Sequence, residues 1–242
     1  MMRLRQHWLG QSPETTMLSE ILNRSVRQAV SLVAVLGVLA GCATPPAPRM
    51  GTLPDRVELT AVPFYQGDDD HGAPTALAAL LRDRGMTVTP GLVEPYLKLP
   101  ASPPGLDRSV EEAARQYGLV VYPLQPDFQA LLTQVAAGNP VLLRYRDGAL
   151  WGTDHYALLI GYDRFRSHVL LRSGAQRRQL ITFSDFVAYW RSAGNWAVLA
   201  QPPAHLPAEV DPARWAAAAN RLGQAGQEVA AQRALSALNA RP

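Results

Sequence analysis

The sequence predicts an α+β domain in which helices come first and a run of antiparallel strands follows. Apolar residues recur at helical spacing in the first half of the chain, as in Leu77, Leu80 and Leu81. Short apolar runs separated by turn residues fill the second half, which is typical of neighbouring antiparallel strands. Hydrophobic residues make up 48% of the 242 residues, so the chain has enough apolar surface for a buried core.

The first half of the predicted domain opens with a strand over residues 57–65, which alternate and carry β-forming side chains. A helix is expected over 74–84, because Pro74 is tolerated in a first turn and Gly85 follows the last apolar residue. Further helices in this half, each closed by proline or glycine, are expected at residues 92–99 and 110–117.

The second half holds most of the sheet. Asp127 is suited to cap a helix over 128–137, and Ser184 to cap another that runs to Trp190. The strands expected here, from their apolar and β-branched content, are 119–123, 141–145, 156–162, 169–172, 179–182 and 196–200.

Two further units are predicted after the domain that spans residues 57–201. Residues 202–212 are rich in proline and are interpreted as a linker. The stretch 213–242 holds two alanine-rich helices, at 213–222 and 228–239, split by Gly226. This pair is expected to form a helical hairpin that packs on the preceding domain.

The N-terminal segment has the pattern of an export signal. Arg24 and Arg27 precede an apolar run over 29–40, which is shorter than the roughly 20 residues that a transmembrane helix needs. The run ends in Leu-Ala-Gly-Cys at Cys42, which resembles the lipobox of bacterial lipoproteins. Residues 1–41 are therefore predicted to be a signal peptide, Cys42 a lipidation site, and 42–56 a proline-rich tether.

Charge and cysteine content exclude some functions. The formal charge is +3, and part of this excess lies in arginines before Cys42, so the exported part is close to neutral. No basic patch with interleaved aromatic residues is present, so no nucleic acid partner is expected. Cys42 is the only cysteine, so the chain forms no intramolecular disulfide and keeps no thiol once Cys42 is acylated.

Several segments in a fixed order carry a family resemblance. Ala-Val-Pro-Phe-Tyr at 61–65 leads through a polar loop to Pro-Thr-Ala-Leu-Ala at 74–78, and Ala-Gly-Asn-Pro-Val at 137–141 precedes His-Tyr-Ala-Leu-Leu-Ile-Gly-Tyr-Asp at 155–163. Together these segments resemble the papain-like cysteine peptidases that process double-glycine bacteriocin leaders. The similarity is greatest to their stand-alone lipoprotein branch, which ends in tetratricopeptide-like helices. The resemblance covers roughly residues 57–201 and implies a papain-like fold.

The same resemblance assigns roles to four positions. The family's nucleophilic cysteine would fall at Gly72, so the nucleophile is lost. His155 matches the catalytic base, and Ser173 stands near the third-member position, which orients the imidazole. Gln66 is a displaced candidate for the oxyanion glutamine, because Gly67 occupies the family's place for that residue.

Other chemistry is possible at these residues and stays open as an alternative. Thr75 or Ser173 could act as a hydroxyl nucleophile, although a hydroxyl needs stronger activation than a thiol. The acidic loop 68–70 with His71, together with Asp154 and His155, could hold a divalent cation. Consecutive acidic residues are usually solvated, so we expect no metal and no cofactor.

The sequence therefore predicts a membrane-tethered, degenerate peptidase-like lipoprotein that binds a peptide or an envelope protein in a relic cleft. Two alternatives remain: an active hydrolase that uses a metal or a hydroxyl nucleophile, and a structural envelope protein. Ala43, rather than aspartate, follows Cys42, which by the lipoprotein resemblance favours the outer membrane facing the periplasm.

Overall fold

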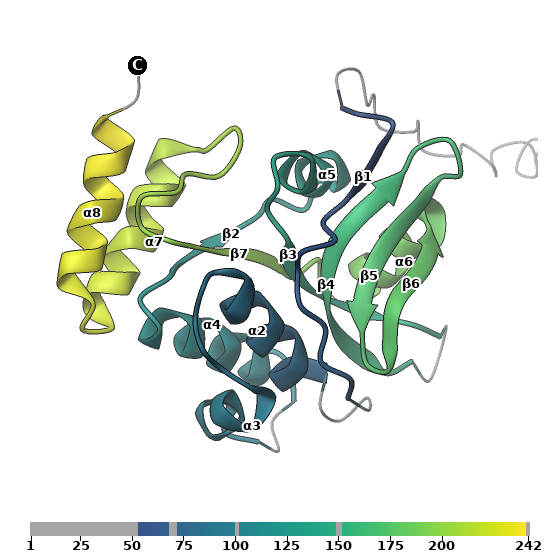
Figure 1. The fold of residues 1–242 in the computed structure, drawn as a ribbon, viewed down its shortest axis with the longest axis horizontal. Helices are drawn as coiled ribbons and strands as arrows, with labels where there is room; N and C mark the ends of the chain where they lie inside the picture. Colours follow the sequence, from purple (N-terminus) through teal and green to yellow (C-terminus); the bar gives the residue numbers. More distant parts are fainter. Residues whose placement is uncertain (1–52, 68–71, 100–101, 149–151, 241–242) are drawn as a thin grey trace, which may run out of the picture. The chain divides into compact units, whose positions relative to one another are not determined.

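An antiparallel sheet of seven strands, with helices against both faces, organises the part of the chain that the structure describes (Figure 1). The structure is a computed structural model and describes residues 53–67, 72–99, 102–148 and 152–240. The strands follow the order β2-β7-β3-β4-β5-β6, and β1 pairs with β4 outside this path. Their bounds are β1 (Arg56–Glu58), β2 (Val120–Pro123), β3 (Val141–Arg146), β4 (Asp154–Asp163), β5 (His168–Ser173), β6 (Gln176–Thr182) and β7 (Ala197–Gln201).

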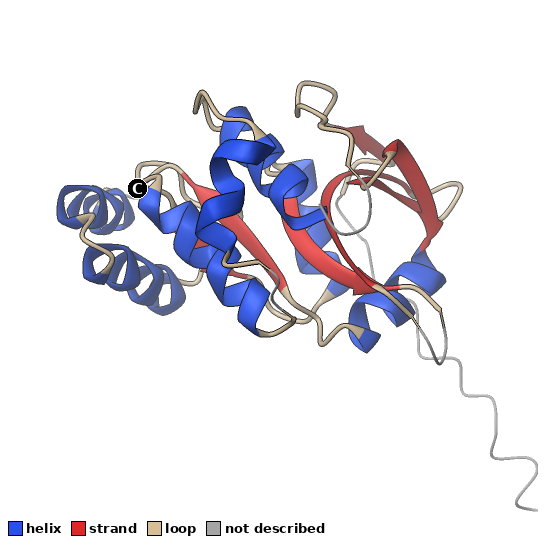
Figure 2. Cartoon of the chain, turned by 90° about the horizontal axis from the view of Figure 1, so that it is seen from below, coloured by secondary structure: helices blue, strands red, loops and turns tan. Residues whose placement is uncertain are grey.

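Helices lie on both sides of the sheet (Figure 2). The bounds are α2 (Gly72–Asp83), α3 (Pro90–Val93), the 3-10 helix η1 (Glu94–Leu97), α4 (Gly105–Gln116), α5 (Phe128–Ala136), α6 (Phe183–Ser192), α7 (Pro212–Gln224) and α8 (Glu228–Asn239). One hydrophobic core lies on each face of the sheet, and alternate residues of β4 belong to different cores. Tyr156 and Leu158 join the core under α2 and α4, whereas Ala157 and Leu159 join the core under α5, α6 and α7. The predicted α+β order is confirmed.

Helix α2 is the most buried helix of the site region. Residues 72–81 are all buried, and Gly85 ends the helix with a φ of 88°, a conformation that glycine adopts without strain. The helix predicted over 74–84 is thus confirmed, and it begins two residues earlier, at Gly72.

Two local predictions are wrong. The strand expected over 57–65 ends at Glu58, because the chain turns there with Thr60 N donating to Glu58 O at 3.1 Å, and Pro63 has no N–H for a ladder. The cap of α6 is Thr182, whose hydroxyl accepts from the backbone N–H of Asp185, while Ser184 lies inside the first turn.

Strand β1 approaches β4 closely at one glycine. A Cβ atom on Gly161 would lie 2.5 Å from the carbonyl oxygen of Val57, where the register of β4 against β5 also shifts. Only glycine admits this approach, so the close spacing of the two backbones depends on the missing side chain.

The C-terminal helices share a core with the sheet. Trp215 of α7 is fully buried, and its indole N–H donates to the carbonyl of Ala234 in α8 at 2.8 Å. The preceding segment, predicted as a linker, is held by side chains of the domain: the Gln134 amide bonds both backbone groups of Ala208, and Tyr122 Oη accepts from Asp211 N. Residues 202–212 therefore lie against the domain.

The N-terminal predictions concern residues outside the described ranges. Cys42, the signal peptide and nearly all of the tether precede Leu53, the first residue described. In the residues from 53 onward that the structure describes, no helix combines the length and apolar character needed to cross a bilayer.

Candidate functional site

The first residue of α2 lies against the start of β4. A Cβ atom built on Gly72 would meet the backbone N and O of Tyr156 at 3.6 Å each, which is an ordinary van der Waals contact. His155 is the residue before Tyr156, so position 72 lies close to His155 in space. The family resemblance predicts this proximity. A side chain at position 72 would therefore fit without displacing the strand.

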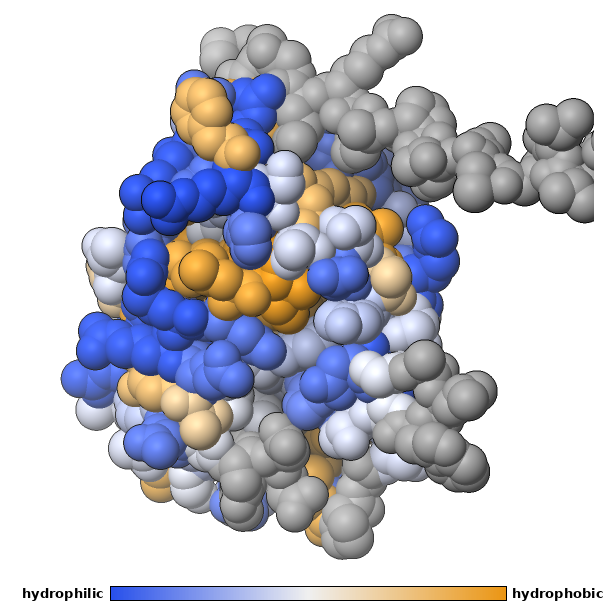
Figure 3. All heavy atoms as spheres, turned by 90° about the vertical axis from the view of Figure 1, so that its right-hand side faces the viewer, coloured by the Kyte–Doolittle hydropathy of each residue, from blue (hydrophilic) through white to orange (hydrophobic). Residues whose placement is uncertain are grey.

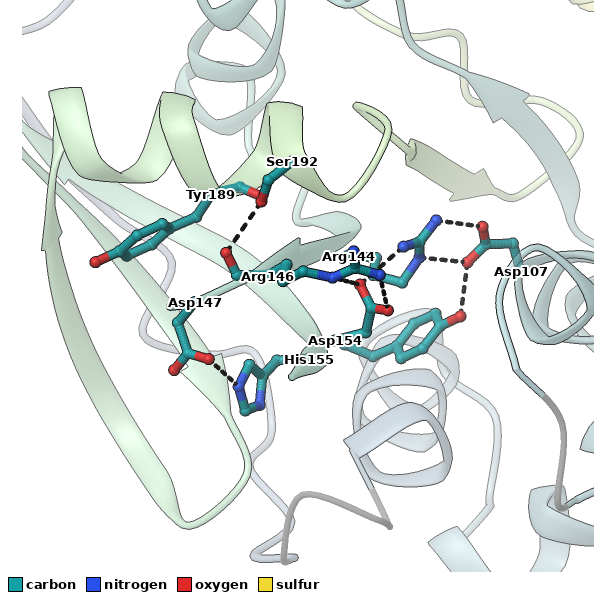
Figure 4. A network of polar contacts seen from close by, with 9 residues as sticks. Asp107, Arg144, Arg146, Asp147, Asp154, His155, Tyr189 and Ser192 are labelled. Atoms are coloured by element: carbon teal, nitrogen blue, oxygen red, sulfur yellow. Dashed lines mark hydrogen bonds and ion pairs between the residues drawn. The ribbon is translucent and has the colours of Figure 1, made fainter. Parts of the chain in front are cut away.

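A carboxylate binds the imidazole of His155. Nε2 of His155 lies 2.9 Å from Oδ1 of Asp147, in the hairpin between β3 and β4 (Figure 4). The histidine side chain is 11% exposed and that of Asp147 is 51% exposed, so the contact lies at the edge of the core. The ring of Tyr145 stacks on the imidazole with centroids 5.1 Å apart. Asp147 thus has the geometry of a residue that orients a histidine.

Asp147 was not among the sequence-predicted residues, although a signal for it existed. β3 and β4 pair in a hairpin in which Tyr145 stands opposite His155, so a residue just beyond Tyr145 must lie close to the histidine. Helix α6 lies beside the backbone before Asp147, because the Ser192 hydroxyl is within hydrogen-bond distance of the carbonyls of Arg146, at 3.1 Å, and Tyr189, at 2.8 Å (Figure 4).

Ser173, at the position expected for the third member, reaches His155 through Tyr145. Its Oγ lies 3.2 Å from Oη of Tyr145, and Tyr145 Oη donates to Oε1 of Gln179 at 2.9 Å. Since the tyrosine has one hydroxyl proton, Ser173 donates in the first contact. The buried serine thereby steadies the ring that stacks on the imidazole.

The remaining predicted residues lie around the start of α2. Gln66 is exposed, and the N–H of the next residue, Gly67, donates to the carbonyl of Gly174 at 3.3 Å. The hydroxyl of Thr75 donates to the carbonyl of Gly72 within the first turn, at 3.1 Å. The acidic loop 68–70 and His71 lie outside the described residues.

A buried ionic network flanks His155 on the side of α4. Arg144 donates from Nε and Nη2 to the two oxygens of Asp107, both at 3.0 Å, and from Nη1 to Asp154 at 2.9 Å (Figure 4). Tyr156 Oη donates to the same Asp107 at 2.6 Å, so the residues on both sides of His155 are anchored. This network was missed by the sequence analysis, because its members are far apart in the chain.

The network sets the ionisation of its members. Burial opposes the charge of Asp154, but hydrogen bonds from Arg146 and Arg144 outweigh it and hold the pKa of that carboxyl below its ordinary value. Burial, followed by the hydrogen bond to Asp107, raises the pKa of Tyr156, so its hydroxyl remains a donor.

The geometry also bears on metal binding. Both oxygens of Asp154 accept hydrogen bonds from arginines, and Asp154 and His155, as adjacent strand residues, point to opposite faces. Within residues 53–67, 72–99, 102–148 and 152–240, no three histidine, cysteine or acidic side chains are grouped as metal ligands.

A small hollow lies beside the first turn of α2. We call it the α2–β5 hollow; it has about 200 Å³ of empty space, and its lining residues are Pro63, Phe64, Tyr65, Thr75, Ala76, Ala79, Leu158, Arg172, Ser173 and Gly174. A second hollow of about 580 Å³ lies between β1 and β6, where Leu170 and Leu180 are surrounded by Arg56, Arg166 and Arg178. The face that carries β5, β6 and α6 shows apolar side chains gathered within a hydrophilic rim (Figure 3). Of these two hollows, the α2–β5 hollow is the one that includes a predicted site residue, Ser173.

Three solved structures are similar to this chain to different degrees. A protein from Bacillus anthracis described as a C39-like peptidase matches with a TM-score of 0.51 and 19% sequence identity, over 61% of this chain and 98% of its own. The peptidase domain of Streptococcus ComA, a bifunctional ABC transporter involved in quorum sensing, matches with a TM-score of 0.42 and 16% identity, over 57% of this chain and 96% of its own. Xylellain, a cysteine protease from Xylella fastidiosa, matches with a TM-score of 0.39 and 16% identity, over 65% and 90%.

The first of these matches defines the fold. The chain has the α+β fold of papain-like peptidases of the C39 type, as the Bacillus anthracis protein shows, and the predicted fold class is confirmed. No protein-family model and no curated protein sequence matches the chain.

Proposed function

We propose that the chain is a membrane-tethered, peptidase-like lipoprotein that binds a peptide or an envelope protein without thiol catalysis. One observation carries the proposal: position 72 has room for a side chain beside the His155 strand, yet it is glycine. A thiolate nucleophile requires a cysteine, and the only cysteine, Cys42, precedes the domain and is expected to be acylated.

The surroundings of the lost nucleophile support a binding role. The His155–Asp147 pair, the Tyr145–Ser173 contact and the Arg144 network all remain formed around position 72. Such buried polar networks are costly unless fully satisfied, so their presence indicates a rigid, pre-organised surface. Rigid surfaces of this kind bind extended peptides at a lower entropic cost than mobile ones.

An active hydrolase with a hydroxyl nucleophile is the second candidate. The Thr75 hydroxyl donates to the carbonyl of Gly72, and the Ser173 hydroxyl donates to Tyr145, so both hydroxyls take part in contacts of the fold. A serine or threonine nucleophile also needs a base within hydrogen-bond reach of its own proton. The test below distinguishes this candidate from binding without cleavage.

The proposed location follows from the lipobox-like sequence before Cys42 and the proline-rich residues after it. A lipid anchor at Cys42 would hold the domain at the outer membrane, facing the periplasm, with the tether as a spacer. The domain would then meet peptides or envelope proteins close to that membrane.

Peptide binding without cleavage tests the proposal. The exported chain carrying Cys42→Ser is screened against a library of fluorescent peptides, with binding followed by anisotropy and peptide integrity by mass spectrometry. Ligands should bind and be recovered intact. Phe64→Ala, which alters the α2–β5 hollow, should weaken binding, whereas Val229→Ala, an exposed position on α8, should leave it unchanged. Cleavage that disappears in His155→Ala would instead establish a hydrolase, and a complete lack of ligands would favour a structural role.

A further inference from the structure

The turn between β4 and β5 exposes a phenylalanine between two arginines. Phe165 is 83% exposed, and its neighbours along the chain are Arg164 and Arg166. The Arg164 side chain pairs with Asp55, whereas the exposed Arg166 side chain has no ion-pair partner among the described residues. A cation beside an exposed aromatic ring suits a membrane interface, where the ring reaches the acyl chains and the cation meets anionic headgroups.

The same turn lies beside the point at which the chain enters the domain. The backbone N–H of Arg164 donates to the carbonyl of Asp55 at 2.8 Å, and its side chain donates to the carbonyl of Leu53. Residues 43–52 alone separate Leu53 from Cys42, so this link spans at most about 40 Å when fully extended. A lipid on Cys42 would therefore keep this end of the domain near the bilayer, where even a weak contact forms readily.

The hollow of about 580 Å³ between β1 and β6 opens next to the turn and has a cationic rim. Its lining includes Arg56, Glu58, Asp163, Arg166, Arg178 and Leu180. Glu58 accepts from Arg178 at 2.9 Å and lies 3.8 Å from Arg56, so one carboxylate offsets two guanidinium groups. Leu180 is 56% exposed. The surface beside the turn thus combines apolar atoms with positive charge that the acidic residues do not cancel.

We propose that the β4–β5 turn, residues 163–167, seats the domain on the anionic lipid surface to which Cys42 is anchored. Phe165 enters the interface between headgroups and acyl chains, and Arg56 and Arg166 donate to lipid phosphates. This inference rests on the proposed lipid anchor and adds an orientation to it. Strand β4 begins beside His155 and ends at the turn, roughly 25 Å further along, so the candidate site is held away from the bilayer.

A fluorophore in the turn tests this contact. Acylation of Cys42 leaves the lipidated protein without a thiol, so Ser167→Cys supplies one labelling position and keeps Phe165. The labelled protein is reconstituted in vesicles of phosphatidylcholine and anionic phosphatidylglycerol that contain a nitroxide-bearing lipid. The label should be quenched at least about threefold more than a label on Gly91→Cys. Gly91 is exposed on α3, at the end of the sheet where β4 begins (Figure 1).

Variants of the turn identify the groups that make the contact. Phe165→Ala and Arg166→Gln should each lower the quenching at position 167 at least about twofold, and vesicles of phosphatidylcholine alone should also lower it. Equal quenching of the labels at positions 167 and 91 would overturn the proposal. A label at position 167 that responds to protein concentration in detergent, yet stays unquenched in vesicles, would also overturn it and would identify a second copy as the occupant.

A separate experiment isolates the surface from the anchor. If a thiol reagent labels the wild-type protein, Cys42 is not acylated and the proposed anchor fails. The exported chain with Cys42→Ser and Ser167→Cys is therefore also held on nickel-chelating lipid by an N-terminal hexahistidine tag. Selective quenching at position 167 in this form supports the membrane-facing turn whatever the state of Cys42, and its absence overturns the proposal.

Discussion

His155 and Asp147 form a hydrogen-bonded pair, with 2.9 Å between Nε2 and Oδ1, across the hairpin that joins β3 to β4. An aspartate in this relation holds an imidazole in one orientation and stabilises its protonated form. The pair is present although position 72 carries no side chain for the histidine to act upon. The contact that orients the histidine is thus formed beside a position that carries no side chain.

Restoring a thiol at position 72 tests how much of the site remains. In a Cys42→Ser background, Gly72→Cys places sulfur at the start of α2, where the helix dipole and His155 favour a thiolate. We expect a thiol-directed reagent at pH 6 to label it at least about tenfold faster than an ordinary cysteine of pKa about 8.5.

The matched control for this experiment is Gly91→Cys. Gly91 is exposed on α3 and has open space around its Cβ position, so a cysteine there should have ordinary reactivity. Adding His155→Ala to Gly72→Cys should reduce its rate to that of the control. Equal labelling rates for Gly72→Cys and Gly91→Cys, with His155 present, would mean that the histidine does not activate a thiol at position 72.

The roles of Asp147 and Ser173 can be separated in the Gly72→Cys background. Asp147→Asn removes the carboxylate that holds the imidazole in place, so the labelling rate at pH 6 should fall. Ser173→Ala removes a contact to Tyr145 only, and its labelling rate should fall much less. A larger effect of Ser173→Ala than of Asp147→Asn would identify Ser173 as the residue that orients the imidazole.

The buried ionic network predicts a large loss of stability at one position. Asp107→Asn leaves Arg144 with a reduced counter-charge in the core and should lower the free energy of unfolding by about 3 kcal/mol in urea denaturation. Asp127→Asn is the control, because Asp127 is an exposed helix cap and asparagine caps equally well. A loss below about 1 kcal/mol for Asp107→Asn would show that Asp154 alone can neutralise Arg144.

The same network predicts an acid sensitivity. Because the folded state lowers the pKa of Asp154, its ionised form contributes stability above the ordinary value near 3.8, and that contribution is lost as the pH falls through the lower folded pKa. The stability difference between the wild type and Asp154→Asn should therefore be constant near neutral pH and shrink below about pH 4. Urea denaturation across this range measures it, and a difference that grows on acidification would contradict the assignment.

Gly161 provides a test of the β1 contact. Gly161→Ala would place a methyl group 2.5 Å from the carbonyl of Val57, so β1 must move, and we expect a loss of about 1–3 kcal/mol. Gly91→Ala, which meets open space, should cost little. Hydrogen exchange should locate the Gly161→Ala effect in residues 56–58, whereas protection unchanged there would show that the strands adapt.

Membrane attachment is tested at Cys42. Full-length protein should fractionate with membranes, because acyl chains on Cys42 would anchor it, and stable anchoring requires at least two such chains. Cys42→Ser removes the residue that carries these chains, so the variant should move to the soluble fraction. Unchanged processing and membrane association in the variant would rule out the lipid anchor.

The sequence predicted the fold well where local patterns determine it. Pro74, Gly85 and the apolar spacing between them identified α2, and the segment around His155 identified β4. It failed where a distant partner decides the outcome, as at residues 59–65, which leave the sheet after β1. The Asp107–Arg144 pair, 37 residues apart, has no local signature at all.

The candidate site likewise contains residues that the sequence predicted and residues that it did not. Gly72 and His155 followed from segment order, and the structure places them side by side. Asp147 is read only from the strand register, which brings the residues after Tyr145 close to His155. That register depends on how the whole sheet pairs, so residue patterns alone do not reveal it.

The shared core of α7 and β2 has a consequence for how the protein melts. Trp215 packs 6.1 Å from the ring of Tyr122, and Asp211 donates to the same tyrosine, so the terminal helices and the sheet lose their contacts together. Calorimetry of the exported chain should show one heat-absorption peak whose van't Hoff and calorimetric enthalpies agree. Removing α7 and α8 by truncation after Gln201 should therefore prevent the remaining sheet domain from folding cooperatively on its own.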